Sequence, residues 1–142
     1  MKCILTSVAV LSALFAHSQA QNPVSVSFDT IYDNPAGSTS TTACSNGPHG
    51  GLELRFPTFG SFPNFPNIGG ASVISGFGSA NCGTCWELEF QGNSINVMAI
   101  DVALNGFNIA EAAFDTLTNG QAENVGRINA TATQVPAFNC GL

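Results

Sequence analysis

Positive charge is scarce in this sequence. Of its 142 residues only three are Lys or Arg, against nine Asp or Glu, and the formal net charge is −6 at pH 7. A protein that binds nucleic acid or an anionic lipid surface needs basic residues to face the phosphate groups. The composition therefore argues against nucleic acid and membranes as partners, and it suits contact with a neutral polymer such as a polysaccharide.

Long apolar runs are missing after residue 20. Before that point, Lys2 precedes an apolar run from Ile4 to Ala16, and the small-residue sequence Ser18-Gln19-Ala20 follows. This pattern is typical of a secretory signal peptide, and the run is shorter than the roughly 20 residues of a membrane-spanning helix. We expect residues 1–20 to be a signal peptide, residues 21–142 to form one secreted domain, and no transmembrane anchor.

The sequence has only five cysteines, and their number is informative. Removing Cys3 with the signal peptide leaves four cysteines, an even number that predicts two disulfides in an oxidising compartment. These are Cys44, Cys82, Cys85 and Cys140. A bond between Cys82 and Cys85 would close a very small loop, whereas both other pairings tie the middle of the chain to its ends. We predict Cys44–Cys82 with Cys85–Cys140, each worth roughly 4 kcal/mol in the chain-entropy model.

Two other uses of cysteine are disfavoured. Cys82-Gly83-Thr84-Cys85 has the spacing of a thioredoxin-like redox motif, but no βαβ pattern surrounds it. A zinc site needs four ligands of suitable spacing, and His49 is the only histidine beyond the signal peptide. We therefore expect neither a metal nor a cofactor.

Hydrophobic periodicity predicts a mainly β domain. Apolar residues alternate with polar ones over 24–28, and 86–90 and 95–100 form a predicted hairpin around a turn at 91–93. Residues 125–135 predict a last strand. Asn108-Ile109-Ala110-Glu111 resembles a capping box, so one helix is predicted from there to Asn119-Gly120. Several short strands without βαβ alternation favour a closed barrel over an open sandwich.

The aromatic residues have two possible roles. Phe56, Phe59, Phe62 and Phe65 recur every third residue among prolines, so they form either an exposed amphiphilic row or a loop folded over the barrel. Burial is the usual fate of large aromatic side chains and is our prediction. Trp86 alternates in phase with Leu88 and Phe90, and we expect it in the core rather than as a sugar platform.

Asp101 is the most suggestive carboxylate, because it ends a buried apolar strand. An acid at the mouth of a barrel can serve acid catalysis or bind sugar hydroxyls, and the alternative is an Asp that caps the loop 102–106. Glycoside hydrolysis needs two carboxylates, and the sequence does not show which acid would be the partner of Asp101. Asn129-Ala130-Thr131 is an N-glycosylation sequon, usable where that strand face is exposed.

Taken together, these residues resemble the cerato-platanin family along the whole of residues 21–142. The motifs that carry the resemblance are 24–30, 32–34, 43–47, 65–70, 81–86, 100–101, 106–109 and the closing 140–142. The resemblance implies a six-stranded double-ψ β-barrel with one or two short helices, disulfides that pair first cysteine with second and third with fourth, and secretion into the fungal cell wall.

The same resemblance implies a function. Family members bind chitin or N-acetylglucosamine oligomers in a shallow groove, loosen cellulose as expansins do, self-assemble at interfaces, and elicit plant defence through a receptor. The segment 82–88 is also similar to a motif of expansins and their related endoglucanases. Those endoglucanases carry a catalytic Asp where this sequence has Asn108, whereas Asp101 resembles the acid that expansins retain. Tyr32 and Asn105 are suggested as further groove residues.

The sequence thus predicts a protein that binds chitin-type or cellulose-type polysaccharide and is not an enzyme. Its predicted carbohydrate-binding residues are Asp101, Tyr32, Asn105 and Asn108. Two alternatives remain: an amphiphilic, surface-active protein of the fungal wall, and a weak endoglucanase-like hydrolase.

Overall fold

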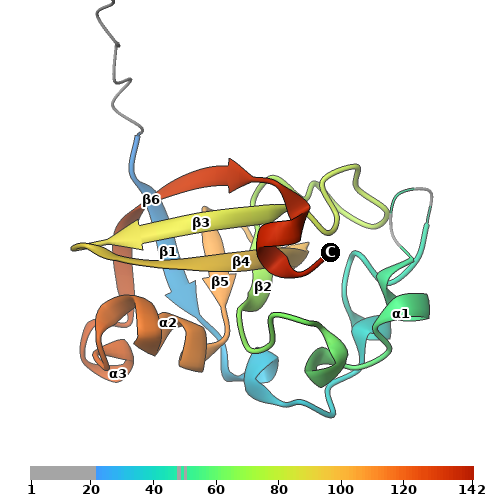
Figure 1. Ribbon diagram of the computed structural model, residues 1–142, viewed down its shortest axis with the longest axis horizontal. Helices are drawn as coiled ribbons and strands as arrows, with labels where there is room; N and C mark the ends of the chain where they lie inside the picture. The colour runs from blue at the N-terminus through green and yellow to red at the C-terminus, as the bar shows by residue number, and fades with distance from the viewer. Residues whose placement is uncertain (1–21, 48, 50) are drawn as a thin grey trace, which may run out of the picture.

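Six β-strands close into a barrel in the computed structural model, which describes residues 22–47, 49 and 51–142 (Figure 1). The predicted signal peptide, 1–20, lies outside these residues. The order around the barrel is β1-β5-β2-β4-β3-β6, with parallel and antiparallel neighbours. Among the described residues, no helix has the length and apolarity to cross a membrane. The strands are β1 (Val24–Phe28), β2 (Ile68–Ala71), β3 (Cys85–Phe90), β4 (Asn93–Val102), β5 (Phe107–Ile109) and β6 (Arg127–Val135).

The four longer strands lie where the alternation predicts them. β3 and β4 pair antiparallel as the predicted hairpin, and Gln91 and Gly92 form its two-residue turn. Both have positive φ, +48° and +83°, the combination whose twist matches that of the strands it joins. Leu88 and Val97 are fully buried in the core. Trp86 is half-buried, packs against that core and lies edge-on to Phe107, as expected of a core residue.

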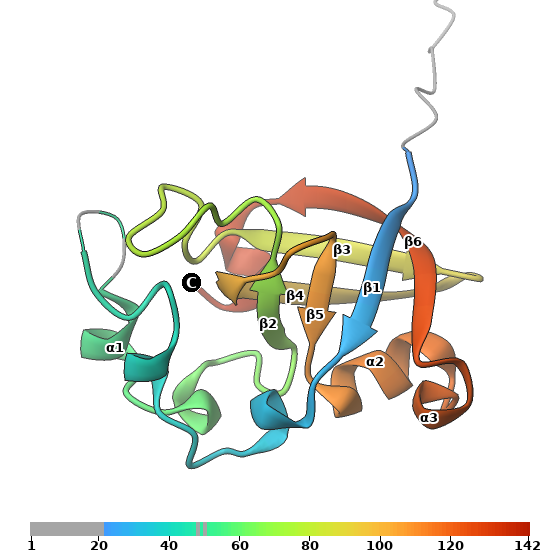
Figure 2. The ribbon, with the colours of Figure 1, turned by 180° about the vertical axis from the view of Figure 1, so that it is seen from behind.

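The two short strands β2 and β5 complete the barrel. β5 pairs parallel with β1 and antiparallel with β2, and β2 pairs parallel with β4. Figure 2 shows β5 between β1 and β2. Strands of three and four residues carry too little alternation to be predicted from the sequence, and pairing with segments distant in the chain stabilises them.

The prediction that Asn108 begins the helix is wrong. Asn108 lies in β5, and helix α2 spans Glu111–Thr118 with Ala110 at its N-cap. The Asp33 carboxylate accepts hydrogen bonds from the backbone N–H groups of Glu111 and Ala112 at 2.7 and 2.9 Å, so a residue distant in sequence caps the helix. The predicted end is confirmed, because Asn119 adopts the left-handed conformation there.

The described residues form three α-helices, two of them single turns, where the resemblance implies one or two short helices. These are α1 (Leu52–Arg55) and α3 (Ala122–Val125), and α2 is the longest. Helix α2 buries Phe114 and Leu117 against the barrel, where the Phe114 ring lies 5.3 Å from that of Phe28. Helices α2 and α3 lie close together beside the barrel, and α1 lies among the long connections between β1 and β2 (Figures 1 and 2).

The phenylalanine row folds back onto the protein, as predicted. Phe59 and Phe62 are 1% and 3% exposed, and Phe56 and Phe65 pack half-buried against the same core. The Phe56 and Phe62 rings lie 4.9 Å apart. This segment is therefore core and does not present four rings to solvent.

Both predicted disulfides are present. Cys44–Cys82 closes a separation of 38 residues and Cys85–Cys140 one of 55. The first fastens the connection after β1 to the segment before β3. The second fastens the C-terminal 3-10 turn, Ala137–Cys140, to the start of β3.

Candidate functional site

Five neighbouring strands each place one residue in a single row across the barrel. The register pairs Arg127 of β6 with Ser27 of β1, Ser27 with Asn108 of β5, Asn108 with Gly70 of β2, and Gly70 with Asp101 of β4. Gly70 carries no side chain, and a Cβ there would strike the backbone of Val102, so the chain after Asp101 crosses directly over it. This crossing separates Asp101 from the other polar members of the row.

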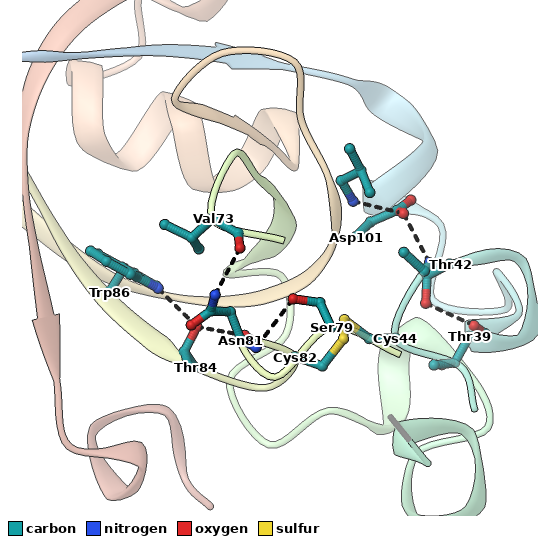
Figure 3. The surroundings of a disulfide bond; sticks show 12 residues. Thr39, Thr42, Cys44, Val73, Ser79, Asn81, Cys82, Thr84, Trp86 and Asp101 are labelled. Carbon is teal, nitrogen blue, oxygen red and sulfur yellow. Dashed lines mark hydrogen bonds between the residues drawn. A yellow bond between two sulfur atoms is a disulfide. The ribbon is translucent and has the colours of Figure 1, made fainter. Parts of the chain in front are cut away.

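Within the described part of the chain, Asp101 accepts three hydrogen bonds. Its carboxylate accepts from the backbone N–H groups of Ala43 at 3.0 Å and Val102 at 2.8 Å, and from the Tyr32 hydroxyl at 3.2 Å. Figure 3 shows it beside the segment that Cys44 fastens. A carboxylate has about four acceptor positions, so this half-buried group retains capacity for one further donor, such as a sugar hydroxyl. The bond to Val102 also makes it the loop-capping Asp that the sequence suggested.

Tyr32 lies beneath Asp101 rather than at the surface. It is 6% exposed, and its ring centroid is 5.8 Å from that of Phe59. Burial raises the pKa of its hydroxyl well above the ordinary value, and the negative charge of Asp101 raises it further. Tyr32 therefore remains a neutral hydrogen-bond donor that orients the Asp101 carboxylate.

Alkaline pH should destabilise the protein through Tyr32. The pKa of Tyr32 is raised in the folded state. Its contribution to the free energy of unfolding is therefore complete below the ordinary tyrosine pKa of about 10, and it is lost as the pH rises toward the pKa of the folded protein. The free energy of unfolding should therefore fall above pH 10, by up to about 1.4 kcal/mol per pH unit. Denaturant unfolding at a series of pH values measures this slope.

Tyr32→Phe is the matched control, since it keeps the ring and removes the titrating hydroxyl. The sequence has one tyrosine, and its only lysine, Lys2, belongs to the predicted signal peptide. The variant should show no such slope, and tyrosinate absorbance of the native protein should develop only as it unfolds. Titration of the folded protein near pH 10 would contradict the assignment.

A groove of about 530 Å³ lies on the other side of the crossing chain. It is lined by the polar residues of the row that lie on β1 and its two neighbouring strands, and by residues of the loop that follows β4. Its lining residues are Ser27, Phe28, Val102, Ala103, Leu104, Asn105, Asn108, Gly126 and Arg127. Leu104 is fully exposed and Val102 is 39% exposed, so these two residues give the groove an apolar rim beside its polar residues.

The groove offers hydrogen-bond donors. The Ser27 hydroxyl donates to Asn108 Oδ1 at 3.0 Å, and this bond leaves the Asn108 amide nitrogen without a partner among the described residues. Arg127 is exposed and donates to the Ser25 hydroxyl, which holds its guanidinium along the strand. Asn105 is exposed at the loop tip. No Asp or Glu occurs among the lining residues that the structure describes.

The four predicted binding residues thus fall into two pairs. Asn105 and Asn108 line the groove, whereas Asp101 and Tyr32 form a hydrogen-bonded pair beside it, connected through Val102. Sequence reasoning missed Ser27 and Arg127, because a polar residue on the outer face of a strand looks like any solvated position. It also missed Leu104, which nothing distinguishes in the sequence from a core residue.

Comparison with protein families and curated proteins gives a consistent result. The family model described as Cerato-platanin matches residues 24–142. The curated protein "Allergen Asp f 15" of Aspergillus fumigatus is 48% identical over 141 residues, covering 96% of this chain and 92% of its own length.

Solved structures with the same fold include two of that family and one more distant protein. Cerato-platanin 2 from M. perniciosa superposes with a TM-score of 0.81 and 52% identity, covering 84% of this chain and 99% of its own. The solution structure of "the fungal elicitor Cerato-Platanin" has a TM-score of 0.75 and 43% identity, over 82% and 96%. An expansin of Clavibacter michiganensis has a TM-score of 0.56 at 18% identity, over 82% and 51%, and shares the fold alone.

Proposed function

The chain belongs to the cerato-platanin family, and from that premise we propose that it is a secreted protein that binds chitin-type or cellulose-type polysaccharide without cutting it. One observation carries the proposal: the groove combines amide and guanidinium donors with an apolar rim and, among the described residues, has no carboxylate in its lining. Sugar rings present hydroxyl groups at their edges and apolar C–H faces, which this combination complements.

The same observation supports the absence of hydrolysis. Cleavage of a glycosidic bond normally needs one carboxyl group to protonate the leaving oxygen and a second to attack or to activate water. Asp101 lies outside the groove lining, and Asn108 stands where the resemblance places the proton donor of related endoglucanases. An amide can hold a sugar hydroxyl but cannot donate a proton as a carboxylic acid does.

Asn108→Ala should weaken binding about tenfold, the effect of losing roughly 1.4 kcal/mol of hydrogen bonding. The measurement is retention of the secreted protein on chitin and on cellulose, with soluble reducing ends assayed in parallel. Asn139→Ala is the matched control, because Asn139 is exposed in the C-terminal 3-10 turn and does not line the groove. Its binding should equal that of the native protein.

Two results would contradict the proposal. Native and Asn108→Ala proteins with equal retention would place the binding site elsewhere. Sustained release of sugar ends that Asp101→Asn abolishes would make the protein a hydrolase, the weak endoglucanase alternative.

Elicitor activity and expansin-like wall loosening belong to the same proposal. Elicitor activity is supported by 43% identity to the fungal elicitor Cerato-Platanin. The two disulfides of this chain support its secretion, because such bonds persist in oxidising compartments. The phenylalanine row does not support the surface-active alternative, because Phe59 and Phe62 are buried.

A further inference from the structure

Asn129 stands in the only Asn-x-Ser/Thr sequon of the chain, and the structure places it on an outward face. In β6 the exposed residues Arg127 and Asn129 alternate with the buried residues Ile128 and Ala130. A glycan on Asn129 would therefore extend into solvent without disturbing the barrel core. Pairing with β3 begins only at Thr131, opposite Glu89, so on the β3 side none of the described residues is paired with Asn129.

The position of Asn129 relative to the groove is specific. Its partner across the strand pair is Ser25 of β1, whose hydroxyl accepts the hydrogen bond from Arg127. Arg127 lies two residues away on the same face of β6, about 7 Å along the strand. Arg127 and Ser27 both line the groove, so Asn129 adjoins the end of the groove that they form.

We propose that Asn129 carries an N-linked glycan whose first sugars lie over Ser25 and Arg127 and close that end of the groove. An N-glycan begins with two linked N-acetylglucosamine residues, whose hydroxyl and acetamido groups accept hydrogen bonds from a guanidinium. The glycan limits how far an oligosaccharide extends past Arg127. Whether Asn129 is glycosylated does not depend on what the groove binds. The effect of the glycan on the length of a bound oligosaccharide rests on the proposed function.

Mass spectrometry of the secreted protein tests whether Asn129 is glycosylated. The full chain is secreted from a filamentous fungal host, and its mass is measured before and after enzymatic removal of N-glycans. The native protein and Thr131→Ser, which keeps the sequon, should lose mass and gain Asp at position 129. Asn129→Gln and Thr131→Ala should have the mass of the unmodified chain. A native protein that already has the unmodified mass overturns the proposal.

The effect on the groove is tested with chitin oligosaccharides of two lengths. The hexasaccharide should bind Asn129→Gln about tenfold more tightly than it binds the glycosylated protein, and the disaccharide should bind both equally. Equal hexasaccharide affinities with the glycan present overturn its placement over the groove. If neither form binds either sugar, the proposed function is wrong, and so is the role of the glycan at the groove. The mass measurement still shows whether Asn129 is glycosylated.

Discussion

Replacing Cys44 and Cys82 together by alanine should lower the free energy of unfolding by about 4 kcal/mol and also weaken oligosaccharide binding. The stability loss follows from the chain entropy that a cross-link over 38 residues removes from the unfolded state. The binding loss follows from what the disulfide fastens. The Cys44 N–H donates to the Ile100 carbonyl and the adjacent Ala43 N–H donates to Asp101, so this segment is docked against the end of β4.

The second disulfide provides the comparison that separates these two effects. Cys85–Cys140 spans 55 residues, and its removal should also cost about 4 kcal/mol. Neither cysteine lies in a segment that donates to Asp101, whose donors among the described residues are Tyr32, Ala43 and Val102. Cys85→Ala/Cys140→Ala should therefore unfold more easily but bind chitin oligosaccharides as the native protein does. Equal binding losses in the two double variants, measured where both are folded, would contradict the role assigned to Cys44–Cys82.

The sequence predicts the parts of this fold whose information is local. Strands β1, β3, β4 and β6 are long enough to show alternation, and the Gln91-Gly92 turn has a local signature. β2 and β5 are not predictable in this way, because they form through parallel pairing with residues far along the chain. The prediction that Asn108 caps the helix is wrong for the same reason. Asn108 satisfies the local helix pattern, but in the fold it pairs with Ser27 and Gly70 and is part of the barrel.

The residues of the site also divide into those that local sequence identifies and those that only the folded chain brings together. Asp101 is identifiable because a carboxylate ends an apolar strand, and Asn108 because of a resemblance between motifs. The closeness of Tyr32 to Asp101, 69 residues apart, and of Arg127 to Ser27, on strands β6 and β1, depends on the closure of the barrel. Hydrophobic periodicity carries no information about such closeness, so the sequence does not distinguish Arg127 from a solvent-exposed cation without a binding role.

Gly106→Ala should be among the most destabilising single substitutions, at about 3 kcal/mol or more. Gly106 begins the return of the chain into β5 with φ of +58°, and an added Cβ would overlap the Ser25 carbonyl oxygen of β1. Its own carbonyl accepts a hydrogen bond from Ser72 at 2.8 Å, so the residue cannot move away from β1 without losing that bond at the end of β2. Displacement here shifts Asn105 and Asn108, which flank it in the groove.

Gly120→Ala separates the steric effect from the backbone effect. Gly120 also has a positive φ, +80°, but no atom of the residues that the structure describes lies within 4 Å of the position its Cβ would take. That variant should lose only the conformational term of about 1 kcal/mol and bind oligosaccharide normally. Chemical denaturation of both variants measures the difference. If Gly106→Ala were no less stable than Gly120→Ala, the close packing of the 103–106 loop on β1 would be refuted, and with it the rigid placement of Asn105 and Asn108 in the groove.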